Sequence, residues 1–178
     1  EADFSGNEML IHFDNLPNGA SFIGNEYAAQ GVNFTSTGNM SFAVSLNPLA
    51  IHSVPNALVN IDINLPQPCS PIELVFDQKM NRVGFWLASN NGESIEVEVS
   101  CITNNMVMAT ETFMTNVTTT FFGLESAAGF DMLVFTAVGN SGNCLAIDDI
   151  RFEGAECCVQ TITVQDNTPP VITCPSVT

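Results

Sequence analysis

Hydrophobic and polar residues alternate with a period of two along most of this chain. In the stretches PIELVF, RVGFWLAS and SIEVEVS every second side chain is hydrophobic, and Glu96 and Glu98 fill the polar positions of the last one. This alternation is typical of β-strands that bury one face, and the 3.6-residue period of an amphipathic helix is almost absent. The residues expected to face the core are Ile72, Leu74, Phe76, Val83, Phe85, Leu87, Ile95, Val97 and Val99.

Further strands follow from the same pattern, and polar turn sequences such as LPNG, NNGES, PQPCSP and GNSGN separate them. About ten short strands with polar turns predict an all-β fold, a β-sandwich of the jelly-roll kind. The other expected strands are Met9–Phe13, Val32–Ser36, Ser41–Ser45, Ala57–Asp62, Met106–Phe113, Thr118–Leu124, Phe130–Val138 and Cys144–Phe152.

The pattern also predicts where the sandwich ends. The stretch FEGAECC marks the boundary between a jelly-roll domain, residues 1–154, and a cysteine-containing, strand-like extension, residues 155–178. At 178 residues, 46% of them hydrophobic, the chain is long enough to bury a sizeable core.

Charge narrows the range of partners. The chain has 3 Lys and Arg against 19 Asp and Glu, which gives a formal net charge of −16. Such a surface repels nucleic-acid phosphates and anionic lipid headgroups, and suits neutral glycans or divalent cations. No apolar run reaches the roughly 18 residues that a membrane span needs, so membrane insertion is not expected.

The first and last expected strands of the sandwich contain the sequence motifs that indicate a family and a metal site. Three stretches resemble secreted bacterial jelly-roll domains related to carbohydrate-binding modules: IHFDNLPNGASFIGNEYAAQGVNF, VFDQKMNRVGFWL and the expected last strand, CLAIDDIRFEG. The resemblance covers roughly residues 9–153 and implies a structural calcium ion between the first and last strands.

The residues support calcium independently of that resemblance. Ile147 and Ile150 are out of phase for one strand face, so Asp148 and Asp149 are expected at a bulge or bend. Two adjacent carboxylates need compensation, and Ca²⁺ accepts six to eight oxygen ligands. Asp14, at the end of the first strand, is the expected partner, with Asn25 and Glu26 as weaker candidates. The alternative is a solvated acidic turn.

Few side chains suit a glycan-stacking platform. Trp86 points away from the core face of its strand, so it is one candidate. Tyr27 is the other, although the resemblance places that tyrosine in the packing of the fold. His12 and His52 suggest no Ser-His-Asp unit, and no pair of carboxylates stands out for glycoside hydrolysis. We therefore do not expect an enzyme.

Six cysteines without CxxC spacing favour disulfides in an extracellular protein rather than zinc. Cys101 and Cys144 both lie in expected strands and are one candidate pair, whereas Cys69 follows a Pro-rich turn. Adjacent Cys157 and Cys158 are expected to take two different partners. The possible N-glycosylation sites are Asn33, Asn39 and Asn116, each in an Asn-x-Ser/Thr pattern.

The last strand-like segment, VITC, has no following strand to pair with. The stretch from Asp166 to Pro175, DNTPPVITCP, resembles the start of a hyalin-type repeat, an immunoglobulin-like adhesion module. Three possibilities remain open: the sequence is an excerpt of a longer surface protein, the tail folds back on its own sandwich, or it pairs with a neighbouring copy. The expected assembly strand is Val171, Ile172, Thr173 and Cys174, with Cys174 bonded to another molecule or to Cys157 or Cys158.

Taken together, these features predict a non-catalytic, extracellular structural or adhesive module. Its expected partners are other copies of itself or neighbouring modules of a surface filament, sheath or matrix. The alternative is a carbohydrate-binding module of a secreted enzyme that degrades polysaccharides.

Overall fold

The computed structural model describes most of the expected sandwich. The described residues are 4–17, 21–22, 24–35, 42–45, 51–59, 69–89, 93–116, 118–138 and 144–154. The extension from residue 155 onward lies outside them, and so do Asn39, Cys157, Cys158 and the predicted assembly strand Val171–Cys174.

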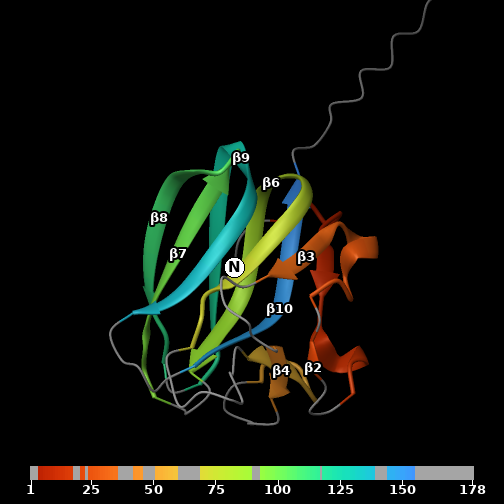
Figure 1. Cartoon of the computed structure of the whole chain (residues 1–178), viewed down its shortest axis with the longest axis vertical. Coiled ribbons are helices and arrows are strands. Elements are labelled where there is room, and N and C mark those ends of the chain that lie inside the picture. The colour runs from red at the N-terminus through yellow and green to blue at the C-terminus, as the bar shows by residue number, and fades with distance from the viewer. Residues whose placement is uncertain are drawn as a thin grey trace, which may run out of the picture.

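The described part of the chain is an all-β fold with ten strands in one antiparallel, hydrogen-bonded network (Figure 1). Two short 3-10 helices, η1 (Phe13–Asn15) and η2 (Ala28–Gln30), interrupt the N-terminal third. The strands are β1 (Met9–Ile11), β2 (Ser21–Phe22), β3 (Val32–Thr35), β4 (Phe42–Ser45), β5 (Ala57–Val59), β6 (Ile72–Ser89), β7 (Glu96–Thr103), β8 (Met106–Met114), β9 (Thr120–Val138) and β10 (Leu145–Gly154).

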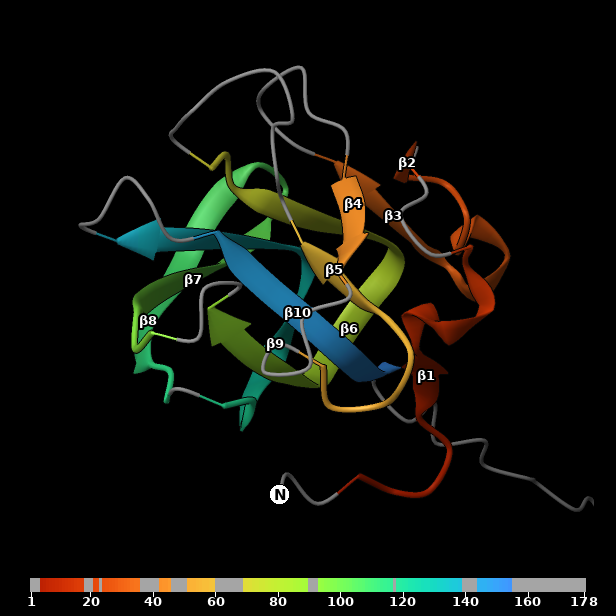
Figure 2. The same cartoon turned by 90° about the horizontal axis from the view of Figure 1, so that it is seen from below.

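Two long strands, β6 and β9, turn this network into two layers. The first part of β6 pairs with β3 and with the second part of β9, which in turn pairs with β7. The second part of β6 pairs with β10 and with the first part of β9. Both strands therefore run through both layers, and the result is a β-sandwich (Figures 1 and 2).

The core lies between the layers. All nine residues that the alternating pattern assigns to the core face are buried. Ring contacts join the layers: Phe76 lies 5.2 Å from Phe152, and Phe85 lies 4.9 Å from Phe135, between ring centroids. The predicted fold class is confirmed.

The strand boundaries differ from prediction in one systematic way. PIELVF and RVGFWLAS belong to the single strand β6, and the expected strands Thr118–Leu124 and Phe130–Val138 are both parts of β9. The polar residues between the two parts of β6 lie at the bend, where register shifts on both sides of Met80 let pairing with β9 continue. A bulge breaks the alternation without ending the strand, so the sequence suggested two strands.

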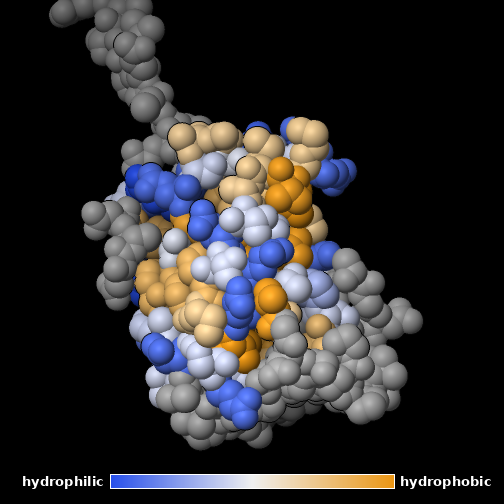
Figure 3. Space-filling model, turned by 90° about the vertical axis from the view of Figure 1, so that its left-hand side faces the viewer, coloured by the Kyte–Doolittle hydropathy of each residue, from blue (hydrophilic) through white to orange (hydrophobic). Residues whose placement is uncertain are grey.

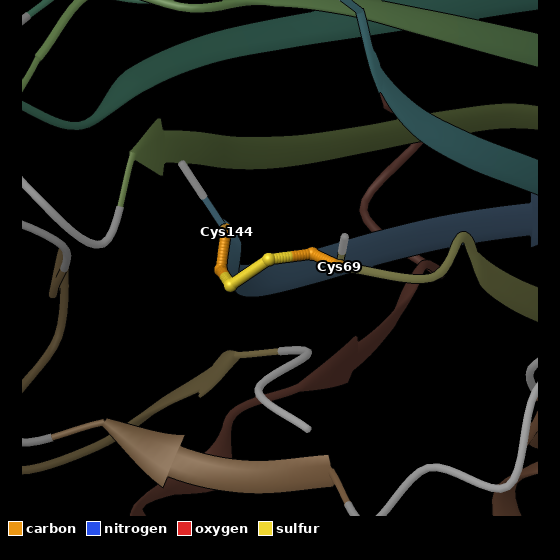
Figure 4. Close-up of a disulfide and its surroundings, with 2 residues drawn as sticks. All are labelled: Cys69 and Cys144. Atoms are coloured by element: carbon orange, nitrogen blue, oxygen red, sulfur yellow. A yellow bond between two sulfur atoms is a disulfide. The ribbon is translucent and has the colours of Figure 1, made fainter. Parts of the chain in front are cut away.

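A disulfide joins Cys69, just before β6, to Cys144, just before β10, with 5.4 Å between the Cα atoms (Figure 4). It packs with Val59, Ala88 and Ala146 in a small second core. The pairing of Cys101 with Cys144 is therefore excluded. Cys101 is a buried free thiol in β7, and burial, with a smaller contribution from Glu111, raises its pKa.

Two of the possible glycosylation sites are described. Asn33 lies in β3, opposite Val75 of β6. Asn116 is exposed just after β8, where its amide nitrogen lies 3.3 Å from Thr120 Oγ1.

Among the described residues no helix is long and apolar enough to span a membrane.

Candidate functional site

The bulge of β10 brings the two predicted acidic residues against the loop that precedes β5. Asp148 is fully buried, and its carboxylate accepts hydrogen bonds from the backbone N–H groups of His52 (2.7 Å), Ser53 (2.9 Å) and Asp149 (2.8 Å). Burial raises its pKa to about 6, and the neighbouring Asp149 adds to the rise, although the three N–H groups oppose it. The register of β10 shifts after Asp148, so the predicted bulge is present.

Asp149 turns toward the same loop. It has a φ of 42°, and its carboxylate lies 2.6 Å from His52 Nδ1 and accepts a hydrogen bond from Ser53 Oγ at 2.9 Å. In a nucleophilic triad the serine hydroxyl donates a hydrogen bond to the histidine, and the aspartate orients the histidine ring. Here Ser53 donates to Asp149 instead, so the three residues hold the loop and do not activate a nucleophile.

The outer face of β6 carries an aromatic cluster centred on Trp86. The indole faces away from the core, and Asp148 lies opposite it on β10. The His52 ring stacks on the indole at 3.6 Å with an interplanar angle of 11°, and Phe121 contacts it edge-on at 5.5 Å. The predicted outward direction of Trp86 is therefore present, but His52 covers one face of the ring.

Tyr27 belongs to the packing of the fold. Its side chain is buried, its hydroxyl lies 2.8 Å from both the His12 carbonyl oxygen and Asn15 Oδ1, and its ring contacts Phe13 and Phe34 edge-on. The ring is thus not available for stacking on a sugar, which removes it from the glycan-binding candidates.

The other predicted calcium ligands, Asp14, Asn25 and Glu26, lie in and near the two 3-10 helices. Asp14 Oδ1 accepts a hydrogen bond from the backbone of Asn56 (3.1 Å), and Glu26 Oε2 accepts one from the backbone of Gly24 (2.8 Å). Asn25 is exposed. Burial raises the pKa of Tyr27, and the negative charges of Glu26, Asp14 and Asp148 raise it further.

Asn56, which the sequence did not single out, has an oxygen suited to a cation. Its side-chain nitrogen donates to the carbonyl oxygens of Phe13 (3.3 Å) and Leu16 (2.9 Å), which fixes the orientation of the amide. Its Oδ1 atom is buried and has no hydrogen-bond partner among the described residues. Carboxamide and carboxylate oxygens are ordinary Ca²⁺ ligands.

Calcium binding remains a prediction. Within the described ranges, no group of three or more His, Cys, Asp or Glu side chains is arranged to hold a metal ion. Asp148 and Asp149 also have protein hydrogen-bond donors of their own. Two observations favour an ion: the Asn56 oxygen has no partner among the described residues, and Asp14 and Asp148 both bond the backbone of the loop that contains Asn56.

A hollow that the sequence gave no signal for lies on another part of the surface. It has a volume of about 350 Å³ and lies between the segment around β1, η2, the bend of β6 and the end of β10. We call it the η2 hollow. Its lining includes Asn7, Gln30, Asp77, Gln78, Met80 and Phe152. No sequence motif marks it because its residues come from four separate segments.

Comparison with protein-family models finds no match, and comparison with curated proteins finds none either. Among solved structures, a family 29 carbohydrate-binding module is similar with a TM-score of 0.51 and 13% identity, over 87% of this chain and 99% of that chain. A cleaved adhesin domain of Lys-gingipain from Porphyromonas gingivalis W83 is similar with a TM-score of 0.53 and 12% identity, over 84% and 99%. At these identities the similarity shows the fold, a β-sandwich of the jelly-roll kind.

Proposed function

We propose that this chain is a non-catalytic, extracellular structural or adhesive module that assembles with neighbouring copies by strand addition. Its fold is shared with an adhesin domain and a carbohydrate-binding module. Its Cys69–Cys144 disulfide is of the kind that persists in oxidising, extracellular surroundings. The proposed assembly rests on one observation, the exposed edge of the sheet at β8.

Strand β8 ends the strand order of the sheet and is exposed along nearly its whole length. Four large hydrophobic side chains on it are more than half exposed: Met106 (64%), Val107 (60%), Met108 (56%) and Met114 (58%). Figure 3 shows this side of the molecule, where hydrophobic side chains lie between hydrophilic ones. Proteins commonly block such edges with Lys or Pro, and β8 contains neither.

The geometry of β8 leaves a regular stretch for an added strand. A register shift places Met108 as an extra residue opposite β7, and from Ala109 to Met114 the strand pairs continuously with Cys101–Glu96. The other edge of these six residues faces outward. Main-chain hydrogen bonds to such an edge provide affinity in strand addition, whatever the added sequence.

The proposed occupant is the segment Val171–Cys174 of a second copy. Three β-branched residues precede Cys174, and the preceding Pro-Pro pair favours an extended chain. The segment lies outside the described residues, so its sequence alone supports this choice. A head-to-tail contact of this kind that does not close produces a fibre.

Sedimentation velocity over a range of concentrations tests the assembly. The measurement is made near physiological salt, where the repulsion between copies of charge −16 is screened beyond about 8 Å. We expect oligomers for the whole chain, and monomers both for a chain without residues 168–178 and for the variant Thr110→Lys/Met114→Lys.

The matched control is Leu10→Lys/Val54→Lys, which makes the same charge change at exposed positions in β1 and in the loop before β5 and should still assemble. A whole chain that stays monomeric at its highest attainable concentration contradicts assembly. Oligomers that survive the β8 change but not the tail deletion contradict β8 as the acceptor.

A second candidate function is binding of neutral glycans, and the similarity to a carbohydrate-binding module favours it. The outward face of Trp86 is one place for it. Native electrophoresis through gels that contain neutral polysaccharides would show it as retardation, and Trp86→Ala would abolish the retardation if this face carries the binding.

A further inference from the structure

We propose that the η2 hollow is a binding site for a neutral glycan. This inference rests on the second candidate function and is independent of assembly through β8. The hollow presents hydrogen-bonding side chains around an apolar floor, and it has a volume of about 350 Å³. Ligand sites commonly measure about 300–1,000 Å³, so the hollow is large enough for a small part of a glycan chain.

The walls of the hollow are fixed to the sandwich. The backbone N–H of Asp77 donates to the Gly31 carbonyl oxygen at 2.9 Å, which fastens the end of η2 to β6. On the other side, Phe152 lies in β10 and packs its ring against Phe76. A site with walls on strands is preformed, and a ligand does not have to order it.

The floor is apolar and the rim is polar. Met80 and Phe152, which are 8% and 2% exposed, form the floor. Around it, Asn7 and Gln78 are exposed and Gln30 is half-buried. Each carboxamide supplies two N–H donors and one acceptor oxygen, and a sugar hydroxyl is both donor and acceptor. The C–H face of a sugar ring can lie on the floor while its hydroxyls meet the rim.

The charges of the hollow favour a neutral ligand over an anion. No Lys or Arg is among its lining residues. Of its two acids, Glu153 accepts a hydrogen bond from the Ser5 backbone at 3.1 Å and lies 4.0 Å from the Arg82 guanidinium. Its charge is therefore balanced within the protein, and Asp77 remains as an exposed acceptor.

A second hollow extends the surface beyond Glu153 and Gly154. It has a volume of about 300 Å³ and is lined mainly by polar residues, among them Asn81, Arg82 and Ser126. The two hollows share Glu153 and Gly154 as a common wall. An oligosaccharide that crosses this wall would contact both, so we expect longer chains to bind more tightly than single sugars.

The test uses affinity electrophoresis of the whole chain with soluble neutral glucans, mannans and galactans, and with polygalacturonate and polylysine as charged probes. We expect retardation by at least one neutral polysaccharide. The variant Gln30→Ala/Gln78→Ala should weaken it about ten-fold or more, since it removes two sets of hydrogen bonds. Both side chains reach the surface, so the melting temperature should change little.

Two controls distinguish the η2 hollow from the other places where a glycan could bind. Asn116→Ala removes an exposed carboxamide far from the hollow, and Trp86→Ala removes the outer aromatic cluster; both should leave retardation by the neutral polysaccharide intact. Loss with Trp86→Ala but not with Gln30→Ala/Gln78→Ala overturns the η2 hollow and leaves glycan binding standing. Retardation by polylysine alone, or by no neutral polysaccharide, overturns both.

Discussion

At the end of β10, Glu153 keeps its charge in a buried position because of its neighbours. The hydroxyl and backbone N–H of Ser5 hold its pKa below the usual value, and the Arg82 guanidinium contributes in the same direction. A carboxyl group whose pKa is lower in the folded than in the unfolded chain stabilises the fold above its unfolded pKa. That contribution is lost as the pH falls through the folded pKa.

We therefore expect Glu153→Gln to be less stable than the parent chain at neutral pH and to approach it in acid. Thermal unfolding between about pH 7 and pH 3 measures this difference, which should shrink below the ordinary glutamate pKa of 4.5. A difference between the two melting temperatures that is constant over the whole range would show that Glu153 makes no such contribution.

A second prediction concerns Gly24, where the backbone leaves no room for a side chain. Its φ is +98°, and a Cβ atom would lie 2.2 Å from the backbone oxygen of Phe34. Gly24→Ala should destabilise the fold by roughly 2–4 kcal/mol, from strain and clash together. Denaturant unfolding measures it.

Gly6 provides the matched control for Gly24. It has a similar φ of +90°, but a Cβ atom there would meet nothing within 4 Å. Gly6→Ala should therefore lower the free energy of unfolding by the backbone strain alone, about 1 kcal/mol. Equal losses for the two variants would mean that the contact with Phe34 is relieved by a small shift.

Part of the residue-level picture could be read from the sequence. The out-of-phase pair Ile147 and Ile150 indicated the bulge at Asp148 and Asp149, because a local pattern records a local backbone change. The partners of those acids could not be predicted in the same way. His52 is 96 residues from Asp148 in the chain, and only the fold brings its loop over β10.

At the scale of elements, the alternating pattern predicted which faces are buried better than it predicted where strands end. β6 continues through a bend at polar residues, among them Asp77 and Gln78, and β9 continues through a bend at the small residues 126–129. Exposed polar residues at a bend look the same in the sequence as those in a turn. The difference lies in pairing with another strand, which the local sequence does not contain.

The disulfide between the segments before β6 and β10 gives a prediction at this scale. It closes a loop of 75 residues, and in the chain-entropy account a crosslink of that length contributes about 4 kcal/mol. Cys69→Ala/Cys144→Ala should lower the free energy of unfolding by a similar amount, as measured in urea.

Cys101→Ala is the control for the disulfide variant. It removes a buried thiol that forms no disulfide, so it should cost only the small loss of packing and leave the loop closed. If the double variant were no less stable than Cys101→Ala, the crosslink would contribute nothing to the folded state.

At the scale of the whole molecule, the two proposed interaction surfaces lie apart. β8 is at one side of the sandwich, and β1, next to the η2 hollow, is at the opposite side (Figure 2). Strand addition at β8 would therefore leave the hollow open. A module with this arrangement could assemble along one side and bind glycans on the other.

The net charge of −16 acts on the whole molecule as well. Repulsion among surface acids destabilises the compact state, and salt weakens this repulsion. Sodium chloride should raise the melting temperature, with little further gain above about 0.15 M, where the Debye length is near 8 Å. A bound calcium ion would add a separate contribution, about 2.7 kcal/mol at 100 times its dissociation constant.

Calcium and screening can be separated by comparing calcium chloride with sodium chloride at equal ionic strength, after chelation and dialysis. If Asp14, Asp148 and Asn56 hold the ion, calcium should raise the melting temperature further, and Asp14→Asn should remove that excess while the response to sodium chloride remains. Asp131→Asn removes the same charge at a carboxylate that accepts a hydrogen bond from the Asn104 backbone on the turn between β7 and β8, so it should keep the calcium response. An equal response to both salts would contradict the calcium site, and would leave the hydrogen bonds from His52, Ser53 and Asp149 as what stabilises Asp148.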